Sequence, residues 1–247
     1  MPENEYTPIP ENQVAPEIVR QETLGRYTAK TFGLMFLGLM VTFGIAFYLS
    51  NTVSGWLMLV QVVRAVPYIH WVILVAELVV VIAMSAMLQK MSPVTAAVCF
   101  FVYAVLTGLT FGIIFTAYDV GTLALIFGFT ALYFGGMAVF GFVTRVDLSR
   151  LRNILLGGLI ALIVVNVLML FIPGLQVLDR VLCTIGVVIF LAYTAYDTQK
   201  LKAYYYGFQG DDAMLKKASI ISALELYLDF INLFLYLLRL FGKNSKN

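Results

Sequence analysis

Seven long runs of apolar residues follow a polar start in this chain, at about residues 31–50, 69–88, 94–116, 120–143, 154–173, 181–204 and 218–241. Each run is close to the ~20 residues that a helix needs to cross the hydrocarbon core of a bilayer. Lipid offers backbone groups no hydrogen-bond partners, so we expect all seven runs to be transmembrane helices. The segments between them, including the one from Asn51 to Pro67, are predicted to be connections.

The polar start, residues 1–29, mixes prolines with glutamates: Pro2, Pro8, Pro10 and Pro16 with Glu3, Glu5, Glu11 and Glu17. This composition cannot build an apolar core, so we expect a disordered cytoplasmic tail. The start is acidic and has no apolar stretch close to Met1, which is unlike a signal peptide. The prediction is a tail over residues 1–29 and one transmembrane domain over residues 30–243.

The composition supports a protein embedded in a lipid bilayer. The 247 residues are 61% hydrophobic and only 12% charged, whereas soluble domains have about 25% charged residues. A net charge of +2 gives no reason to expect a nucleic-acid partner. We find no Gly-rich phosphate loop, GxSxG or HExxH motif, so we expect neither an enzyme nor a cofactor. Cys99 and Cys183 are interpreted as packing residues and His70 as an interfacial residue.

Lysine and arginine residues predict the orientation, because they collect on the cytoplasmic side of membrane proteins. With a cytoplasmic N-terminus, the inner side carries Arg20, Arg26, Lys30, Lys90, Arg145, Arg150, Arg152, Lys200, Lys202, Lys216 and Lys217, and the outer loops carry only Arg64 and Arg180. Seven spans then place the C-terminus outside. Arg239, Lys243 and Lys246 oppose that placement, and the alternative is a last run that turns back toward the cytoplasm.

The third run contains the sequence GLTFG, from Gly108 to Gly112. Small residues four positions apart let two helix backbones approach each other closely. We interpret this motif as a packing site within the bundle rather than as a dimerisation face.

Two aspartates, Asp197 and Asp229, lie inside the sixth and seventh runs. A carboxylate in the hydrocarbon region costs roughly 2.5–3.5 kcal/mol on insertion scales, so it needs partners or a polar path. Asp197 shares a helix face with Lys200, and Asp229 shares one with Glu225, at i+3 and i+4 spacings. The two aspartates fall at a similar depth on consecutive antiparallel helices, so they can meet.

Two carboxylates in contact cannot both ionise cheaply, so we expect one of them to keep its proton near neutral pH. Such a pair can respond to pH, and it can also hold Ca²⁺, which favours clustered carboxylate oxygens. The alternative is two separate structural carboxylates that are hydrogen-bonded to neighbouring polar groups.

Glu77 and Arg239 are the other charged residues predicted at membrane depth. Arg239 is long enough to reach inward, so the two side chains could meet and seal the outer side of the bundle. The alternative for Arg239 is a cation that extends toward the lipid headgroups.

The stretches AYDTQKL around Asp197 and LYLDFINLFLYLLRL around Asp229 strongly resemble the bacterial branch of the Bax inhibitor-1 family, and the similarity is collinear over about residues 20–243. The resemblance implies a seven-helix bundle with the last helix enclosed by the others. It also implies a pH-sensitive calcium leak of the bacterial inner membrane, in which Asp197 and Asp229 carry the pH response. A Glu–Arg contact of the family matches Glu77 and Arg239. The family's arginine on the second helix is missing, with only Gln89 and Lys90 nearby.

Three functions therefore compete. The first is a calcium or other cation channel or exchanger that the aspartate pair gates. The second is a non-transporting regulator of a membrane protease of the FtsH type, or of another membrane partner. The third, an intramembrane aspartyl protease, is disfavoured because Asp229 lies in LYLDF and lacks the GxGD motif. The sequence leaves the oligomeric state open.

Overall fold

The computed structural model describes residues 23–87, 90–171 and 178–242, and these residues form an all-α membrane protein. This confirms the predicted fold class. The elements are α1 (Leu24–Asn51), α2 (Val53–Ala65), α3 (Ile69–Met87), α4 (Pro93–Phe115), α5 (Val120–Val143), the short 3-10 helix η2 (Leu148–Leu151), α6 (Arg152–Phe171), α7 (Asp179–Gly207) and α8 (Asp212–Phe241).

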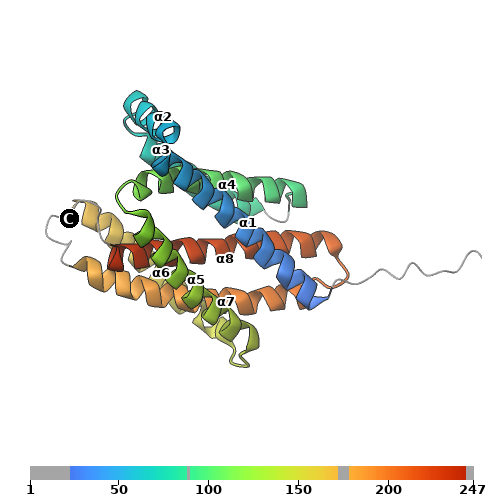
Figure 1. The fold of residues 1–247 in the computed structure, drawn as a ribbon. Helices are drawn as coiled ribbons and strands as arrows, with labels where there is room; N and C mark the ends of the chain where they lie inside the picture. Colours follow the sequence, from blue (N-terminus) through green and yellow to red (C-terminus); the bar gives the residue numbers. More distant parts are fainter. Residues whose placement is uncertain (1–22, 88–89, 172–177, 243–247) are drawn as a thin grey trace, which may run out of the picture.

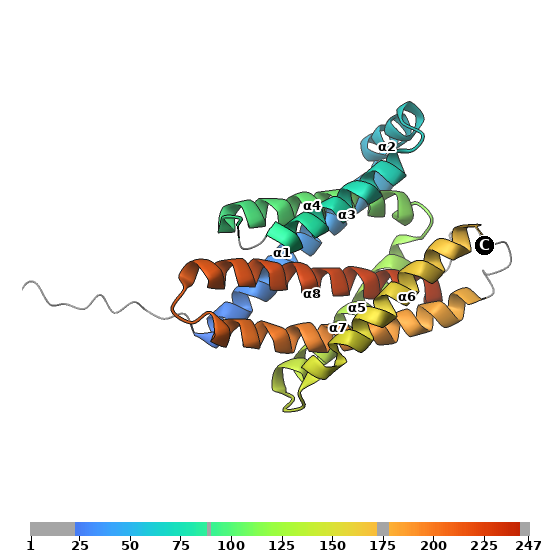
Figure 2. The ribbon, with the colours of Figure 1, turned by 180° about the vertical axis from the view of Figure 1, so that it is seen from behind.

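The long helices lie side by side and α8 runs through the middle of the bundle (Figures 1 and 2). α7 packs along one side of α8, and α1 and α4 pack along the other. We call the end where α1 and α8 begin the Leu24 end, and the end where α8 finishes the Phe241 end. α7 runs antiparallel to α8, so α7 finishes at the Leu24 end.

Six described helices are long and apolar enough to cross a membrane: α1, α4, α5, α7, α8, and α6 together with η2. The bent pair of α2 and α3 is a seventh candidate, with an angle of 94° between the two helices. The exact count of seven spans and the enclosure of the last helix by the others stay predictions. α8 differs from the others in how much of it the protein covers. In its apolar 18-residue segment 72% of the residues are buried, compared with 11% in the corresponding segment of α6.

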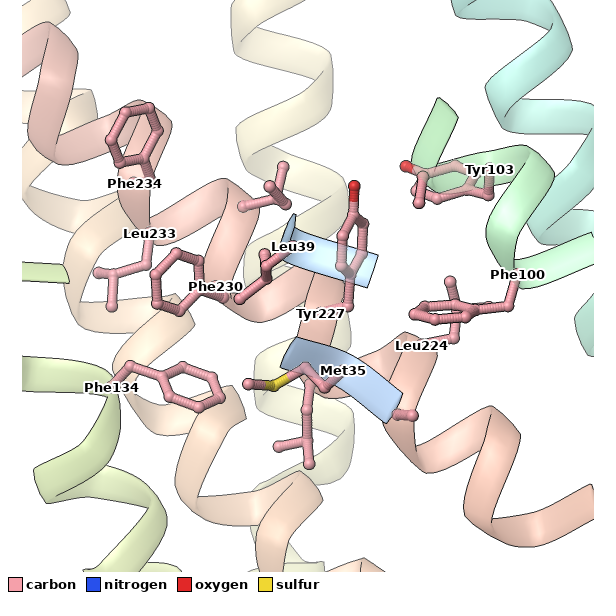
Figure 3. Packing of buried hydrophobic residues seen from close by; sticks show 14 of the residues in the cluster. Met35, Leu39, Phe100, Tyr103, Phe134, Leu224, Tyr227, Phe230, Leu233 and Phe234 are labelled. Carbon is pink, nitrogen blue, oxygen red and sulfur yellow. The ribbon is translucent and has the colours of Figure 1, made fainter. Parts of the chain in front are cut away.

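The core lies around α8 and combines aromatic rings with leucine and other aliphatic side chains (Figure 3). The Tyr227 ring packs edge-on against Phe100 of α4, with ring centroids 5.6 Å apart. Its hydroxyl lies 2.6 Å from Thr42 Oγ1 of α1, and Thr42 in turn donates to the Ala104 carbonyl of α4. Burying a tyrosine is favourable when its hydroxyl finds a partner, and this one joins α1, α4 and α8.

Glycines set the closest helix contacts. A Cβ atom on Gly112 would come within 2.8 Å of Leu49 Cδ1, and one on Gly108 within 3.0 Å of Ile45 Cβ. The GLTFG motif therefore packs α4 against α1 within the bundle, as predicted. Gly141 of α5 brings that helix against the Ala195 backbone of α7, where a side chain would clash.

Two boundaries differ from the sequence prediction. α1 begins at Leu24, so residues 24–29 belong to the first helix and not to the tail; the Thr23 hydroxyl accepts the Arg26 N–H and caps it there. The segment from Asn51 to Pro67 was predicted to be a connection, but it contains α2. The Thr52 hydroxyl accepts the Gly55 N–H and starts this second helix directly after α1.

Candidate functional site

A cavity of about 320 Å³ lies between α6, α7 and α8 and contains both aspartates. The antiparallel packing of α7 and α8 places Asp197 and Asp229 on facing sides, so the structure brings the two predicted residues together. Polar and charged residues on its wall are Arg152, Tyr193, Tyr196, Asp197, Lys200, Glu225, Asp229 and Asn232. Leucines of α6 and α8 and Phe190 complete the wall.

Lys200 is the cation at the centre of this cluster. Its Nζ lies 2.7 Å from Glu225 Oε1 on α8 and 3.8 Å from Asp197 Oδ1 on its own helix. The Asp197 side chain is 8% exposed, and those of Lys200 and Glu225 are about a quarter exposed. The sequence placed Lys200 on the face of Asp197. In the structure Lys200 also pairs with Glu225 and so joins α7 to α8.

The carboxyl groups outnumber their cation. Asp197 and Asp229 interact side chain to side chain, and both lie within electrostatic range of Glu225 and Lys200. Asp229 Oδ2 and Glu225 Oε2 are buried without a hydrogen-bond partner among the described residues. A buried oxygen without a partner is costly and accepts a proton or a cation readily.

Gln199, next to Lys200, fixes the connection between α5 and α6. Its amide accepts the Leu148 N–H and donates to the Val146 carbonyl, both at 2.8 Å. Lys202 donates to the Phe142 carbonyl at the end of α5. The AYDTQKL stretch therefore combines two tasks, because it carries the cavity charges and also holds the neighbouring loop on α7.

The predicted contact between Glu77 and Arg239 is absent. Arg239 pairs with Asp179 at the start of α7 and donates to Asn166 Oδ1 of α6 at 2.9 Å. Glu77 accepts a hydrogen bond from Thr110 of α4 instead. The sequence suggested that Arg239 is long enough to reach inward to Glu77, but α3 packs on α4 while the last turn of α8 faces α6 and α7.

Lys90 does not join the aspartates. It is exposed in the turn before α4, and no ion pair within the described ranges includes it. The cations near the pair are Lys200 and, on the cavity wall, Arg152 of α6. The sequence did not identify Arg152 or Asp179 as site residues. Both lie in the short polar breaks between apolar runs, where charged residues are expected in any membrane protein.

The charge cluster is not a ready metal centre. Within the part of the chain that the structure describes, no three His, Cys, Asp or Glu side chains are grouped closely enough to hold a metal ion. Ca²⁺ takes 6–8 oxygen ligands, and the Lys200 ammonium lies among the carboxylates.

Comparison with known proteins identifies the family. Residues 24–246 match the family described as "Inhibitor of apoptosis-promoting Bax1". The chain belongs to the Bax inhibitor-1 family. It is 40% identical to "Inner membrane protein YbhL" of Escherichia coli K12 over 222 residues, which cover 89% of this chain and 92% of that protein.

Two uncharacterised relatives extend the comparison. One from Borreliella burgdorferi is 36% identical over 236 residues, covering 92% of this chain and 97% of the relative. One from Deinococcus radiodurans is 37% identical over 227 residues, covering 90% and 94%. Family membership confirms the resemblance that the two aspartate stretches indicated, and it makes this chain an integral membrane protein.

Proposed function

We propose that this Bax inhibitor-1 family member is a cation leak pathway, with calcium as its main cargo, that opens when the Asp197–Asp229 pair takes up protons. The observation that carries the proposal is the charge imbalance in the cavity. Three carboxyl groups line the cavity, those of Asp197, Glu225 and Asp229. They outnumber its two cations, Lys200 and Arg152.

This excess of carboxyl groups over cations makes the site sensitive to pH. If all three carboxyl groups are ionised, the cluster carries excess negative charge in a poorly solvated place, which is unfavourable. A proton shared by the aspartates removes one charge and leaves Lys200 paired with Glu225. The pair then titrates as a unit rather than as two independent acids.

Proton uptake also acts on the helix contacts. In the charged state, Lys200 on α7 attracts Glu225 and Asp229 on α8, and this holds the two helices together. Protonation of the pair weakens the attraction between Lys200 and Asp229. The leak should therefore increase as the pH falls, because fewer charges hold the Leu24 end of α7 and α8 closed.

The sequence and the relatives support the setting that we propose for this pathway. YbhL is named an inner membrane protein, and we place this chain in the same membrane, with its N-terminus in the cytoplasm and its C-terminus outside. Calcium would then cross along the carboxylate-lined cavity between α6, α7 and α8.

Calcium flux into liposomes at neutral and acidic pH tests the proposal. The unmodified protein should leak more at acidic pH. Asp197→Asn and Asp229→Asn each remove one titrating group and nearly keep the shape, so each should flatten the pH dependence, and the double variant should abolish it. Asp119→Asn is the matched control, because Asp119 caps α5 through the Thr122 N–H at an exposed position and asparagine can cap in the same way.

Two outcomes would overturn the proposal. A double variant that keeps the full pH response would exclude the aspartate pair as the sensor. An unmodified protein that passes no calcium at any pH would favour the competing function, a non-transporting regulator of a membrane protease or another membrane partner. Capture of a protease from solubilised membranes by the full-length chain would then be the next measurement.

A further inference from the structure

A further carboxyl group, that of Glu77, lies at membrane depth, apart from the aspartate cavity. Glu77 is half-buried on α3, eight residues after Ile69, or about 12 Å along the helix at 1.5 Å per residue. Its neighbours on α3, Leu74, Val75 and Leu78, expose half or more of their surface, as residues that face lipid do. An ionised carboxylate at this depth is expensive unless something neutralises it.

Hydroxyl groups surround Glu77. Thr110 Oγ1 donates to Glu77 Oε1 at 3.0 Å. Thr107, one turn earlier on α4, is 3% exposed, and its Oγ1 lacks a hydrogen-bond partner among the described residues. Tyr103 of α4 and Tyr227 of α8 are the titratable groups within electrostatic range of Glu77. All of these neighbours are neutral groups at physiological pH.

No cation reaches the Glu77 carboxyl from the described parts of the chain. The described ion pairs involve Lys200 or Arg239, and Arg239, the partner predicted from sequence, is bound to Asp179 and Asn166. A single carboxyl group among hydroxyl groups has too little negative charge to hold a divalent ion, because such ions favour several carboxylates. The remaining way to neutralise Glu77 is a proton.

An apolar cavity of about 360 Å³ lies between α2, α3 and α4, and residues next to Glu77 and Thr110 in the sequence line it. Its wall includes Ile73 and Ala76 of α3 and Leu106 and Leu109 of α4, which stand in the same helical turns as Glu77 and Thr110. An apolar reagent that dissolves in the bilayer can therefore approach the carboxyl from a side that water-soluble reagents do not reach.

We propose that Glu77, held by Thr110 and flanked by Thr107, Tyr103 and Tyr227, is a second proton-binding site within the membrane. It lies between α3 and α4, on the other side of α8 from the aspartate cavity. This site is independent of the proposed leak, because it shares no charged residue with the aspartate cavity.

Infrared spectroscopy of the full-length protein in lipid provides the decisive test. The measurement uses the Asp197→Asn, Asp229→Asn double variant, in which the pair cannot contribute a protonated carboxyl. We expect a protonated-carboxyl C=O band at neutral pH that is lost when Glu77→Gln is added. Thr110→Val should keep the band and shift it to higher frequency, because the C=O then loses its hydrogen bond. If the Glu77→Gln change removes no protonated-carboxyl band, the proposal is wrong.

A lipid-soluble carbodiimide gives a second readout that locates the site. The protonated carboxyl adds across one C=N bond of the reagent: its proton goes to nitrogen and its oxygen to the central carbon. The adduct rearranges to an N-acylurea and no group leaves, so the protein gains the full mass of the reagent.

The unmodified protein is treated with this reagent in liposomes, and the labelled residue is found by peptide mass spectrometry. We expect the adduct on Glu77, its loss in Glu77→Gln, and its decrease as the pH rises. A water-soluble carbodiimide should not label this position. Labelling of Asp197 or Asp229 with none on Glu77 would count against the proposal.

Discussion

Two clusters of charged residues join α7 to α8, one around Lys200 and one around Arg239 at the Phe241 end. Lys200 faces three carboxyl groups in a cavity, and two of their oxygens have no partner in the described structure. Arg239 has one carboxylate, Asp179, and one amide, Asn166, and its pair is about one-third exposed. The first cluster has too few cations, whereas the second is balanced.

The two clusters therefore contribute to the bundle in different ways. A balanced and partly exposed pair contributes little beyond holding its helices in register, because water and headgroups screen it. A crowded buried cluster is stable only when the protons bound to its carboxyl groups bring its net charge close to zero. Variants at the two cations should therefore behave differently.

The largest effect should come from Lys200→Met. It leaves three carboxyl groups without their cation, and removing one partner of a buried pair typically costs about 3–5 kcal/mol. We expect a loss of that order in the free energy of unfolding in detergent, and a smaller loss at acidic pH, where protons replace the cation. Adding Glu225→Gln should restore part of the stability.

Lys216→Met is the matched control for this experiment, since Lys216 is exposed on α8 and surface changes usually stay within about 0.5 kcal/mol. A Lys200→Met protein as stable as this control at every pH would show that the cluster around Lys200 does not hold α7 to α8.

The next largest effect should come from Gly141→Ala, which tests whether the cluster depends on the position of α7. The added methyl group would clash with the Ala195 backbone, two residues before Asp197. Overpacking of this kind costs about 1–3 kcal/mol, and the displaced α7 should also alter the pH response of calcium flux. Gly135→Ala, which meets nothing within 4 Å, should change neither quantity. Equal behaviour of the two variants would contradict the close contact of α5 with α7.

Arg239→Gln should have a smaller effect and leave the pH response intact. The variant removes a pair whose side chains are 37% and 33% exposed, and pairs of this kind contribute about 0–1 kcal/mol. Thermal unfolding and calcium flux should both be measured. If Arg239→Gln destabilised the protein as much as Lys200→Met, the distinction between the two clusters would be lost.

The smallest effect concerns Asp147, a carboxylate in the loop outside the membrane. Hydrogen bonds from the Ser149 side chain and backbone N–H hold the pKa of Asp147 below its usual value. Its stabilising effect is therefore present above the unfolded-state pKa and is lost as the pH falls through the lower folded-state pKa. Carbon NMR of the carboxyl should show this low titration, and Ser149→Ala should raise the pKa. A carboxyl that titrates at its ordinary value would refute this prediction.

The sequence predicted the helices well because apolar length is the main requirement for crossing a bilayer. The run at 120–143 matches α5 residue for residue, and the run at 69–88 matches α3 to within one residue. The meeting of Asp197 and Asp229 could also be predicted, since consecutive antiparallel helices at matched depth leave few other arrangements.

Two features could not be predicted, for a physical reason. Depth along a helix follows from counting residues, but the direction in which a side chain points follows from how the helices pack. The length of the Arg239 side chain suggested that it could reach Glu77, but the two residues face different neighbours. α2 was missed because it is only 13 residues long, too short to span, and a length criterion counts such a helix as a connection.

The burial of α8 has a consequence for how the protein is assembled. Its most apolar window is less hydrophobic than that of α4, with mean hydropathy 1.7 against 2.3, and far more of it is covered by protein. α8 is also synthesised after the helices that pack on it, α1, α4, α5 and α7. Until α8 arrives, the faces of these helices that contact it have no partner. Insertion of α8 is therefore the step that completes the bundle, and chains that stop before Asp212 should be recognised by the cell as unfinished and degraded.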